Sequence, residues 1–446
     1  MVKLTKMEKA IKTLKDDDYV ALQHIYLYRT LTITQLMESV YHLKDNQTRR
    51  RNAIMKRLLD LDVVSLEDYK SEEHAVNLTT TGINIVRQTK DIPQEIFDDK
   101  LKVVKRGYYT AAELKMKKNL LNHQLTKNNF MLKFQNLIAK PEFKDLMDQS
   151  HIRFKYQYFD EKYLTTYRMM RPDSVLHVAN TDYFIEEDMA TESAQQLKDK
   201  WKHYREFMAT SEFNMKENDI VVLFLTDNIV REKSLRRREE LVRLTAMQVL
   251  GDKFTNHFDM IIGSQNEILQ IMPKLILQAY HVDPDILNLY QVLGKQGWKF
   301  TDTDFLSRQL NHENYLAYMI QLDSKGQLLT VHYRDREFIL DDYRLRPVAV
   351  MHRIYWLNHN SIIFHNMFKR HLQYIVIVNP DQETNLIKDL KSINCLIQTN
   401  LFFTTLKRIE TLPLKDALFR FDQSGKRYHF SNEELVDRVY EKEDLK

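Results

Sequence analysis

Acidic residues and a lysine follow one another between Pro172 and Lys200 in an order suited to phosphodiester chemistry. Asp173 begins one apolar run, and Glu186 and Asp188 stand at the end of the next. Carboxylates at neighbouring strand ends can hold a hard divalent cation, Mg²⁺ or Mn²⁺, through oxygen ligands. Such a cation can activate a water molecule and stabilise charge on a scissile phosphate, and a nearby lysine adds positive charge. These residue types predict a metal-dependent site that acts on DNA.

Two strands and a helix must position these residues. Residues 174–178 and 183–188 are predicted strands, and residues 192–208 are a predicted helix with Thr191 as its N-cap. A further, almost wholly apolar strand is predicted over 219–225, where it would be central in the sheet. Helices over 111–139 and 231–250 and strands over 151–159 and 257–262 complete a mixed α/β sheet with helices on both sides.

Strand geometry decides which acids meet. Alternate strand residues share a face, so Glu186 and Asp188 point together and Glu187 points to the other face. Asp173 is expected close to the Glu186 face, and Lys200 is expected to reach back from its helix. The simpler alternative is that the acids cap neighbouring helices and that the lysine is solvated.

Composition limits the class of protein. The chain has 446 residues, of which 43% are hydrophobic and 29% are charged, which suits a folded protein of several domains. The net charge of +4 means that any nucleic-acid surface must be a local patch. Cys395 is the single cysteine, which excludes internal disulfides and fits a reducing cytoplasm. The N-terminus lacks a signal-peptide core, and no apolar run is long enough for a membrane span, so we expect a cytoplasmic protein without membrane insertion.

The first hundred residues predict a winged helix-turn-helix. The apolar patterns predict three helices over residues 19–28, 32–37 and 45–59, with Thr32 as the N-cap of the second. They then predict a hairpin of two strands over 62–65 and 76–78, and a further helix over 79–87. The third helix of this fold enters the major groove of DNA. Its apolar pairs, Ile54 with Leu58 and Met55 with Leu59, are expected to face inward.

The third helix also carries a basic cluster. Arg49, Asn52 and Lys56 share a face and would reach bases or phosphates. Further arginines, namely Arg50, Arg51 and Arg57, would add contacts to the DNA backbone. The alternatives are a solvated basic face or a winged helix that contacts protein.

Four stretches together resemble the replication-relaxation family of plasmid-borne proteins, which includes the MOBC-type conjugative relaxases. They are the winged-helix start, NHQL at 122–125, Pro172–Asp173 followed by FIEEDMATE at 184–192, and KWKHY at 200–204. The resemblance covers roughly residues 15–265. Each motif is short, but their order and spacing are more specific than any one of them.

The resemblance implies a PD-(D/E)xK-like nuclease core. Asp173 and Glu186 would be metal ligands, Asp188 would be a third acid, and His123 would support the site from its helix. Asp188 stands where the common nuclease pattern has a lysine, so the lysine would come from the following helix, as Lys200 or Lys198. Glu187 replaces an apolar residue of the family pattern. It would be an alternative ligand, or the strand register differs by one.

The resemblance also implies a task. A MOBC-type relaxase recognises the transfer origin on double-stranded plasmid DNA and nicks one strand, with a coupling protein or other relaxosome components as partners. Tyr108 or Tyr109 would be the residue for a covalent DNA link, which we regard as a minor alternative. Two other readings stay open: a catalytically inactive DNA-binding accessory protein for plasmid replication, relaxosome assembly or transcriptional control, and a relaxosome scaffold.

The last third predicts a second α/β unit that binds a partner or clamps DNA. The patterns predict helices over 285–297, 301–305, 311–320 and 383–392, a buried segment over 351–368, a charged tail over 433–446, and strands over 326–331, 336–340, 374–378 and 401–406. Asp341 and Asp342 follow a strand there but lack a matching Pro–Asp strand. The predicted class is therefore α/β (α+β), with a winged-helix domain at 1–100, a PD-(D/E)xK-like domain at 101–280 and an accessory domain at 281–446.

Overall fold

The chain forms two compact units. The computed structural model describes residues 5–44, 46–70, 73–90, 96–97, 103–105, 109–143, 163–164, 169–170, 172–178, 181–210, 219–227, 232–253, 258–279, 283–301, 317–321, 337–368, 373–398 and 400–429. Unit 1 comprises Met1–Tyr163, Arg171–Ala179 and Phe184–Met189; unit 2 comprises Leu164–Met170, Asn180–Tyr183 and Ala190–Lys446. The predicted domain boundaries at residues 100 and 280 stay predictions.

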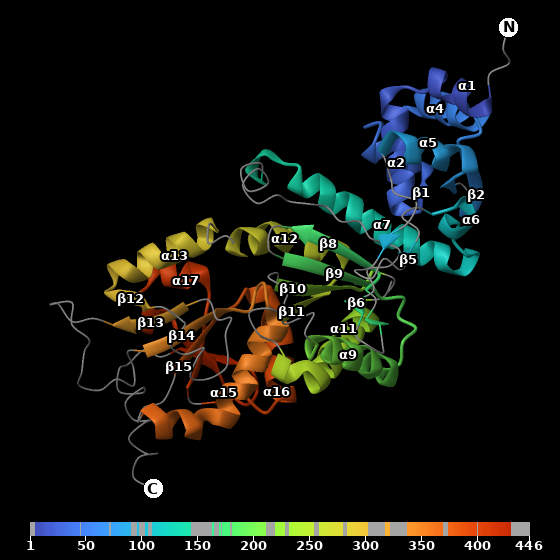
Figure 1. The fold of residues 1–446 in the computed structure, drawn as a ribbon. Coiled ribbons are helices and arrows are strands. Elements are labelled where there is room, and N and C mark those ends of the chain that lie inside the picture. Colours follow the sequence, from blue (N-terminus) through green and yellow to red (C-terminus); the bar gives the residue numbers. More distant parts are fainter. Residues whose placement is uncertain are drawn as a thin grey trace. The chain divides into compact units, whose positions relative to one another are not determined.

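Unit 1 begins with helices and a small antiparallel sheet (Figure 1). The helices are α1 (Lys6–Thr13), α2 (Asp16–Tyr28), α3 (Ile33–Ser39), α4 (Thr48–Asp60) and α5 (Thr80–Lys90). The strands β1 (Thr30–Thr32), β2 (Val64–Lys70) and β3 (Glu73–Leu78) form a sheet of order β1-β3-β2. Helices followed by a hairpin is the predicted order; the assignment as a winged helix stays a prediction.

Helix α4 buries one apolar face, as its spacing predicts. Ile54, Met55 and Leu58 are buried, so three of the four residues predicted to face inward do so. The prediction was wrong for Leu59, which is 37% exposed near the last turn of the helix. A helix of 13 residues packed on one side leaves its opposite face to solvent.

Two predicted helix starts can be compared with the observed caps. Thr32 caps α3 as predicted, because its side chain accepts from the Gln35 N–H while the Gln35 side chain accepts in return. The prediction of Thr191 for the helix after the acidic strand was wrong. Ser193 caps that helix with the same reciprocal arrangement to Gln196, so α9 spans Ala194–Met208.

The predicted long helix over 111–139 is two helices, α6 (Ala111–Leu114) and α7 (Lys118–Ile138). Lys115 and Lys117 adopt extended backbone conformations that separate the two helices. The break places Met116 in a small buried cluster, which also contains Ala75, Leu121, Leu125 and the partly buried Tyr69. Burial of Met116 against the hairpin therefore accompanies the interruption.

A four-stranded sheet carries the predicted acids. Its order is β11-β10-β9-β8, with β8 (Ser174–Val178), β9 (Thr181–Glu187), β10 (Asp219–Leu225) and β11 (Phe258–Gly263). Strands β10 and β11 pair in parallel. The predicted strands over 174–178 and 219–225 are confirmed to the residue. The helices α11 (Glu232–Leu250) and α12 (Gln265–Ala279) follow β10 and β11 in the chain.

A seven-stranded sheet organises the rest of unit 2. Its strands, in sheet order, are β12 (Trp298–Thr301), β13 (Ala317–Gln321), β14 (Glu337–Asp342), β15 (Gln373–Ile377), β16 (Leu401–Thr404), β17 (Phe419–Phe421) and β18 (Arg427–His429). The three middle strands β14, β15 and β16 are parallel, and the outer pairs are antiparallel. The helices are α13 (Pro284–Lys295), α15 (Pro347–Phe368), α16 (Glu383–Ser392), α17 (Leu406–Thr411) and α18 (Leu414–Ala417).

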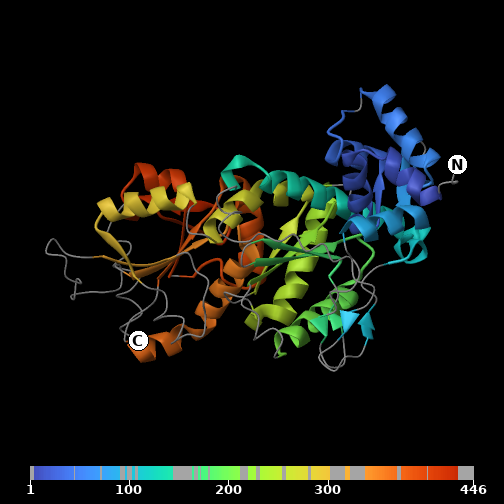
Figure 2. The same ribbon diagram turned by 45° about the horizontal axis from the view of Figure 1, so that its top comes forward.

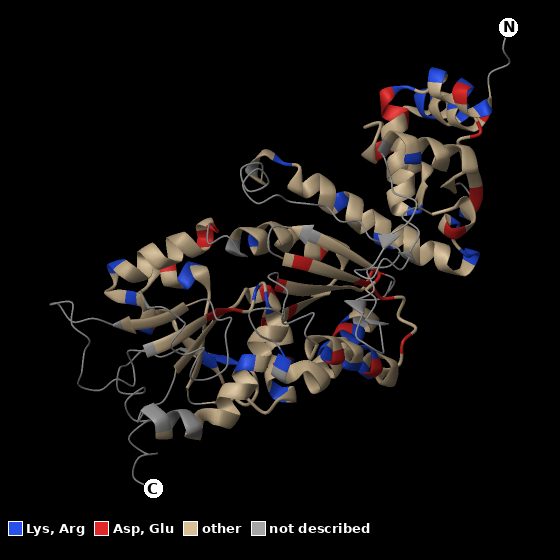
Figure 3. Ribbon diagram, in the orientation of Figure 1, with Lys and Arg blue, Asp and Glu red and all other residues tan. Residues whose placement is uncertain are grey.

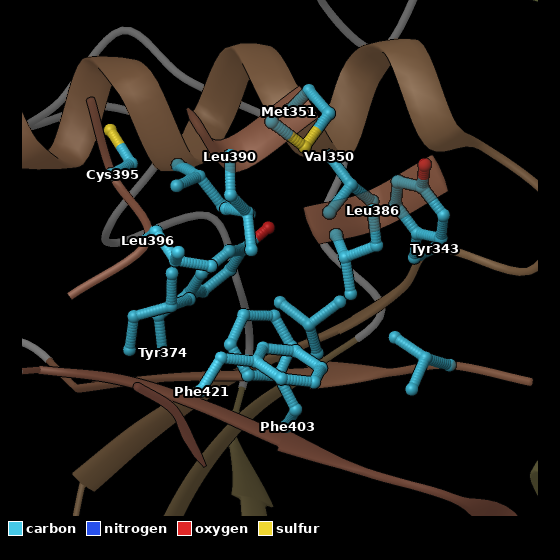
Figure 4. Close-up of a cluster of buried hydrophobic side chains, with 14 of the residues drawn as sticks. Tyr343, Val350, Met351, Tyr374, Leu386, Leu390, Cys395, Leu396, Phe403 and Phe421 are labelled. Atoms are coloured by element: carbon cyan, nitrogen blue, oxygen red, sulfur yellow. The ribbon is translucent and has the colours of Figure 1, made fainter. Parts of the chain in front are cut away.

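Helices cover both faces of this sheet (Figures 1 and 2). Tyr374 and Val376 of β15 pack in one buried cluster with α15 and α16 (Figure 4). Ile375 and Ile377 belong to another cluster, with α13 and α17. The alternation follows from the twofold repeat of a strand, and it explains why β15 reads as an unbroken apolar run. The mixed α/β class is confirmed.

Some sequence expectations were wrong or fall elsewhere. Residues 317–320 form part of strand β13, not a helix, because β13 pairs with strands on both sides. Strand β16 ends at Thr404, and the following α17 takes the rest of the predicted strand. The predictions for residues 151–159, 326–331 and 433–446 lie outside the described residues.

Within the described ranges, no helix combines the length and the apolar character that a membrane span requires.

Several short elements complete the fold. They are β4 (Ile96–Phe97) paired antiparallel with β5 (Val103–Lys105), β6 (Tyr163–Leu164) paired with β7 (Met169–Met170), and the short 3₁₀ turns η1 (Pro141–Phe143), η2 (Gly251–Lys253) and η4 (Pro380–Gln382).

Candidate functional site

Helix α7 turns two polar side chains toward the start of β8. His123 and Lys127 are four residues apart and therefore lie on one face of the helix. The Nε2 atom of His123 lies 3.1 Å from Oδ2 of Asp173. The Lys127 ammonium donates to the main-chain carbonyl of Asp173 at 2.7 Å. The helix thus contacts both the carboxylate and the backbone of the first predicted acid.

Strand β9 holds Asp173 from the other side. The Asp173 N–H donates to the Ile185 carbonyl at 2.9 Å. The Glu187 N–H donates to Oδ2 of Asp173, also at 2.9 Å. Asp173 is therefore fixed between α7 and the end of β9. We call the group formed by His123, Lys127, Asp173 and the acids at 186–188 the acidic site.

Charges around Asp173 favour its ionised form. Desolvation, which is the largest influence, would raise the pKa of Asp173. The hydrogen bond and charge of His123, with the charge of Lys127 and the Glu187 N–H, outweigh desolvation and hold the pKa of Asp173 below its usual value. The carboxylate is thus an anion at neutral pH, as a cation ligand must be.

Lys127 is buried, with an exposed fraction of 3%. Its burial lowers the pKa of the ammonium to about 8, while the carboxylates of Asp173 and Glu187 act in the opposite direction and the charge of Arg29 adds to the lowering. The negative charges of two acids of the site therefore both favour the charged form of Lys127. Lys127 was not predicted from the sequence, although its spacing from His123 in NHQLTK offered a signal.

The three consecutive acids of the site are all buried. The exposed fractions are 4% for Glu186, 4% for Glu187 and 1% for Asp188. Because strand residues alternate, Glu187 lies on the opposite face from Glu186. The ligand roles of Glu186 and Asp188 stay predictions.

Lys200 has partners of its own within unit 2. Its ammonium lies 3.2 Å from Oε1 of Glu192 and 5.6 Å from the centre of the Phe224 ring. Arg238 adds a second cation, since it donates to the Glu192 carbonyl. The predicted approach of Lys200 to Glu186 stays a prediction.

The residues can be tested for their fit to a divalent metal. Asp173, Glu186 and Asp188 supply hard oxygen donors, the type that Mg²⁺ and Mn²⁺ prefer. Among the described residues, no group of three or more His, Cys, Asp or Glu side chains is arranged to hold a metal ion. A Mg²⁺ ion commonly uses only one or two carboxylates and completes its shell with water and substrate phosphate. The donors fit such a shared site by type.

Helix α4 carries a basic cluster, and Figure 3 marks the Lys and Arg positions of the ribbon in blue. Arg49, Arg50, Asn52 and Lys56 are exposed. Arg51 is half-buried and donates to the Thr34 hydroxyl at 3.0 Å. Four of the five predicted DNA-binding residues therefore face solvent, and the fifth contacts α3.

Arg57 of α4 forms an ion pair with a buried aspartate of α2. Its guanidinium donates to both carboxylate oxygens of the fully buried Asp18, at 3.0 and 2.6 Å. The Tyr41 hydroxyl donates to the same carboxylate at 2.8 Å. This bidentate pair ties α4 to α2, and the expected contact of Arg57 with the DNA backbone stays a prediction.

The N-terminal segment also holds α7. The Asn128 amide donates to the carbonyls of Tyr28 at 3.0 Å and Thr30 at 2.6 Å. The Tyr69 hydroxyl, from hairpin strand β2, donates to Asn122 at 2.5 Å, one residue before His123. One helix therefore contacts the α2–β1 connection, the hairpin and Asp173.

Tyr109 is the described member of the tyrosine pair. Its N–H donates to the Tyr26 hydroxyl at 3.1 Å. Tyr108 lies outside the described residues. The idea of a covalent tyrosine link stays a prediction.

Comparison with known proteins tests the suspected family. Residues 22–223 match the replication-relaxation family, which confirms the family resemblance that the sequence motifs indicate. The matched range contains α4, α7, β8 and β9. The family indicates a role in plasmid replication or mobilisation. No curated protein and no solved structure was found to match the chain.

Proposed function

From the match of residues 22–223 to the replication-relaxation family, we propose that this protein binds double-stranded plasmid DNA at a transfer origin and nicks one strand. In this proposal α4 contacts the DNA and the acidic site cuts it. The protein would act as a relaxase of the MOBC type, with a coupling protein or other relaxosome components as partners.

The arrangement around Asp173 is the observation that carries the cleavage proposal. Asp173 is ionised, partly accessible at 28% side-chain exposure, and held from both sides by His123 and the Glu187 N–H. An anion fixed in this way is preorganised to bind a cation or to orient a water molecule. A purely structural aspartate needs no such access.

A divalent cation, Mg²⁺ or Mn²⁺, would be held by Asp173 together with Glu186 and Asp188. When bound, it supplies a Lewis acid for the phosphate and lowers the pKa of a water ligand. His123 orients the Asp173 carboxylate through its ring nitrogen. The chain's own contribution is thus to fix one anionic ligand and to compensate its charge.

The surface of α4 supports the DNA-binding proposal. Arg49, Arg50 and Lys56 are exposed cations on one helix, and Asn52 offers an amide of the kind that reads adenine. The Arg57–Asp18 pair fixes the last turn of the helix to α2. Such a helix can enter a major groove without losing its own packing.

A nicking assay tests the proposal. Supercoiled plasmid that carries the parent transfer origin is incubated with the full chain and Mg²⁺ or Mn²⁺, with EDTA as control. We expect metal-dependent conversion to the open circle, and we expect Glu186→Ala to abolish it while DNA binding persists. Tight binding without any nick would move the protein to the catalytically inactive accessory class, and no binding at all would reject both roles.

A further inference from the structure

Helix α7 contacts the N-terminal segment (residues 6–78) and Asp173 through two pairs of consecutive residues. In the first pair, Asn122 accepts from the Tyr69 hydroxyl of the hairpin at 2.5 Å, and the Nε2 atom of His123 lies 3.1 Å from the Asp173 carboxylate. Consecutive residues of a helix point about 100° apart, so one member of a pair can face each side. The first pair therefore connects the hairpin to Asp173.

The second pair repeats this arrangement further along the helix. Lys127 donates to the Asp173 carbonyl at 2.7 Å. Asn128 donates to the carbonyls of Tyr28 at 3.0 Å and Thr30 at 2.6 Å, on either side of the α2–β1 connection. Two separate points of α7 thus contact both the N-terminal segment and Asp173, which restricts rotation and sliding of the helix between them.

Asn128 is the most completely used of these contacts. Its side chain is fully buried, and besides its two donated hydrogen bonds its Oδ1 atom accepts from Gln124 at 3.0 Å. Gln124, one turn earlier, also donates to the Tyr28 carbonyl at 3.3 Å. A buried amide whose donors and acceptor are all engaged has one orientation, so it fixes the groups that it binds.

The connection that Asn128 binds has an unusual backbone. Arg29 lies between Tyr28 and Thr30 and has a φ of 62°, which is uncommon for a residue with a side chain. Its guanidinium donates to the carbonyls of Glu113 at 2.8 Å and Leu114 at 3.3 Å, at the end of α6. Such a conformation persists only where surrounding contacts hold it, and it is often found at functional positions.

We propose that Asn128 is a positioning residue that sets where the nick falls relative to the bound DNA sequence. This inference rests on the proposed nicking function. The Arg57–Asp18 pair holds α4 to α2, the carbonyl at the end of α2 is held by Asn128, and α7 contacts Asp173. Three helices therefore connect the proposed DNA contact to the proposed cleavage site.

The spacing of DNA phosphates shows why this connection must be firm. Successive phosphates of one strand are about 3.4 Å apart along the axis of B-DNA. A displacement of α7 by that distance relative to α4 would bring Asp173 to the next phosphodiester. Selection of one phosphodiester therefore requires that the contacts of Asn128 persist while DNA is bound.

Mapping of the nick by primer extension tests the proposal. We expect the full chain to nick at one phosphodiester and Asn128→Ala to nick at neighbouring positions as well, with kcat lower by roughly tenfold and DNA affinity unchanged. A merely structural role would reduce the amount of folded protein without moving the nick. The matched control is Asn136→Ala, which changes an exposed asparagine of the same helix and should nick as the wild type does.

A distance measurement tests the same contact without nicking. Cys395 is the single cysteine, so a Cys395→Ser background allows spin labels at Leu59→Cys of α4 and Lys133→Cys of α7, both exposed positions. We expect one narrow distance distribution, which Asn128→Ala should broaden. Tyr69→Phe removes only the hydroxyl that donates to Asn122, should broaden the distribution less, and decides the question if Asn128→Ala does not fold.

The two readouts separate this inference from the proposed function. If the wild type never nicks, the proposed function and the role of Asn128 in nick position both fail, while the distance distributions still decide whether Asn128 fixes α7. Distributions that stay narrow in both variants would overturn the proposal whatever the nicking result. A broader distribution with the nick still at one phosphodiester would also overturn it, because α7 would then not select the position.

Discussion

The acidic site of unit 1 and the aspartates of β14 in unit 2 use the same kind of residue in opposite ways. The Asp173 carboxylate contacts His123 of α7, its main-chain carbonyl accepts from Lys127, and its side chain keeps partial access to solvent. Asp341 and Asp342 are 2% and 3% exposed and are paired with arginines. In both units the acids stand at the start or the end of a strand, so position alone does not distinguish them.

The partner of each acid does distinguish them. Arg344 donates to both oxygens of Asp342, at 2.8 and 2.7 Å, and Arg353 with Tyr374 donates to Asp341. Arginine stays charged at all accessible pH values, and its planar guanidinium can donate hydrogen bonds to both oxygens of a carboxylate. Burial leaves the pKa of Asp341 raised in spite of Arg353, whereas the pKa of Asp173 is lowered. The two arginine-paired aspartates are closed off from solvent, whereas the Asp173 carboxylate, in contact with His123, keeps the partial access that the proposed cation would need.

The largest expected effect is on nicking, and it tests whether Asp173 differs in function from the arginine-paired aspartates. Asp173→Asn should reduce the nicking rate by roughly a thousandfold or more, because a neutral amide is a poor metal ligand. Its effect on Tm should be small beside that of a mutation in the arginine-paired cluster. Plasmid nicking and thermal unfolding measure the two effects, and the surface variant Asp199→Asn serves as a control. A variant that nicks at the wild-type rate would remove Asp173 from the chemistry.

The next largest expected effect is on stability, and it concerns the arginine-paired aspartates of β14. Arg353→Met should lower the free energy of unfolding by about 3–5 kcal/mol, because Asp341 is left buried without its cation. The double variant with Asp341→Asn should recover part of this loss. Denaturant unfolding monitored by tryptophan fluorescence measures both. Equal stability of Arg353→Met and the wild type would show that the ion pair does not hold β14 to α15.

Exposed and paired arginines of α4 extend the comparison to cations. The double variant Arg49→Ala/Lys56→Ala should weaken DNA binding about tenfold or more and reduce the salt slope by about one for each phosphate that is no longer neutralised. Arg57→Ala should instead lower the Tm, since Asp18 loses its partner. Titrations at several salt concentrations measure the slope, with Lys9→Ala on α1 as control. An unchanged slope would contradict DNA contact by α4.

The smallest effect concerns an acid of unit 2 without a dedicated arginine. Burial, with the charge of Glu267, raises the pKa of Glu239 to about 7, and Arg243 compensates little because it pairs with Asp389. Between its ordinary value and about 7, the folded chain holds a proton that the unfolded chain has released. Stability should therefore fall as pH rises through this window.

Glu239→Gln should remove this pH dependence and raise stability by about 1 kcal/mol at pH 8, after discounting for partial solvent access. At pH 4 the same variant should match the wild type. The measurement is the free energy of unfolding at both pH values. An equal gain at both would point to packing in place of charge.

Local pattern was sufficient for much of the fold. The strand Asp219–Leu225 is apolar after its first residue and is followed by polar residues, and Thr32 forms a reciprocal cap with Gln35. These features depend on neighbours in the chain. Strand β13 depends instead on pairing with β12 and β14, and such pairing overrides local propensity.

The candidate site shows the same limit more sharply. Asp173 and His123 were singled out from motifs, but Lys127 reaches Asp173 across 46 positions, and its spacing from His123 shows only that the two share a helix face, not that they contact Asp173. Arg57 and Asp18 meet across 39 positions. A cation looks alike in sequence whether it faces solvent, DNA or a buried acid, so its role needs the fold.

The amide contacts of α7 bear on how such proteins evolve. Asn128 donates to a carbonyl of the α2–β1 connection, and Tyr69 of the hairpin donates to Asn122. The next residue, His123, contacts the Asp173 carboxylate. The segment proposed to bind DNA and the aspartate proposed to act in cleavage therefore both contact one helix, α7. An exchange of only the first hundred residues between relatives would keep the main-chain acceptors at positions 28 and 30, but the hydrogen bond to Asn122 would depend on the residue that the new hairpin carries at position 69. If α4 binds DNA as proposed, a new specificity is most readily inherited as a block that includes both the hairpin and α7.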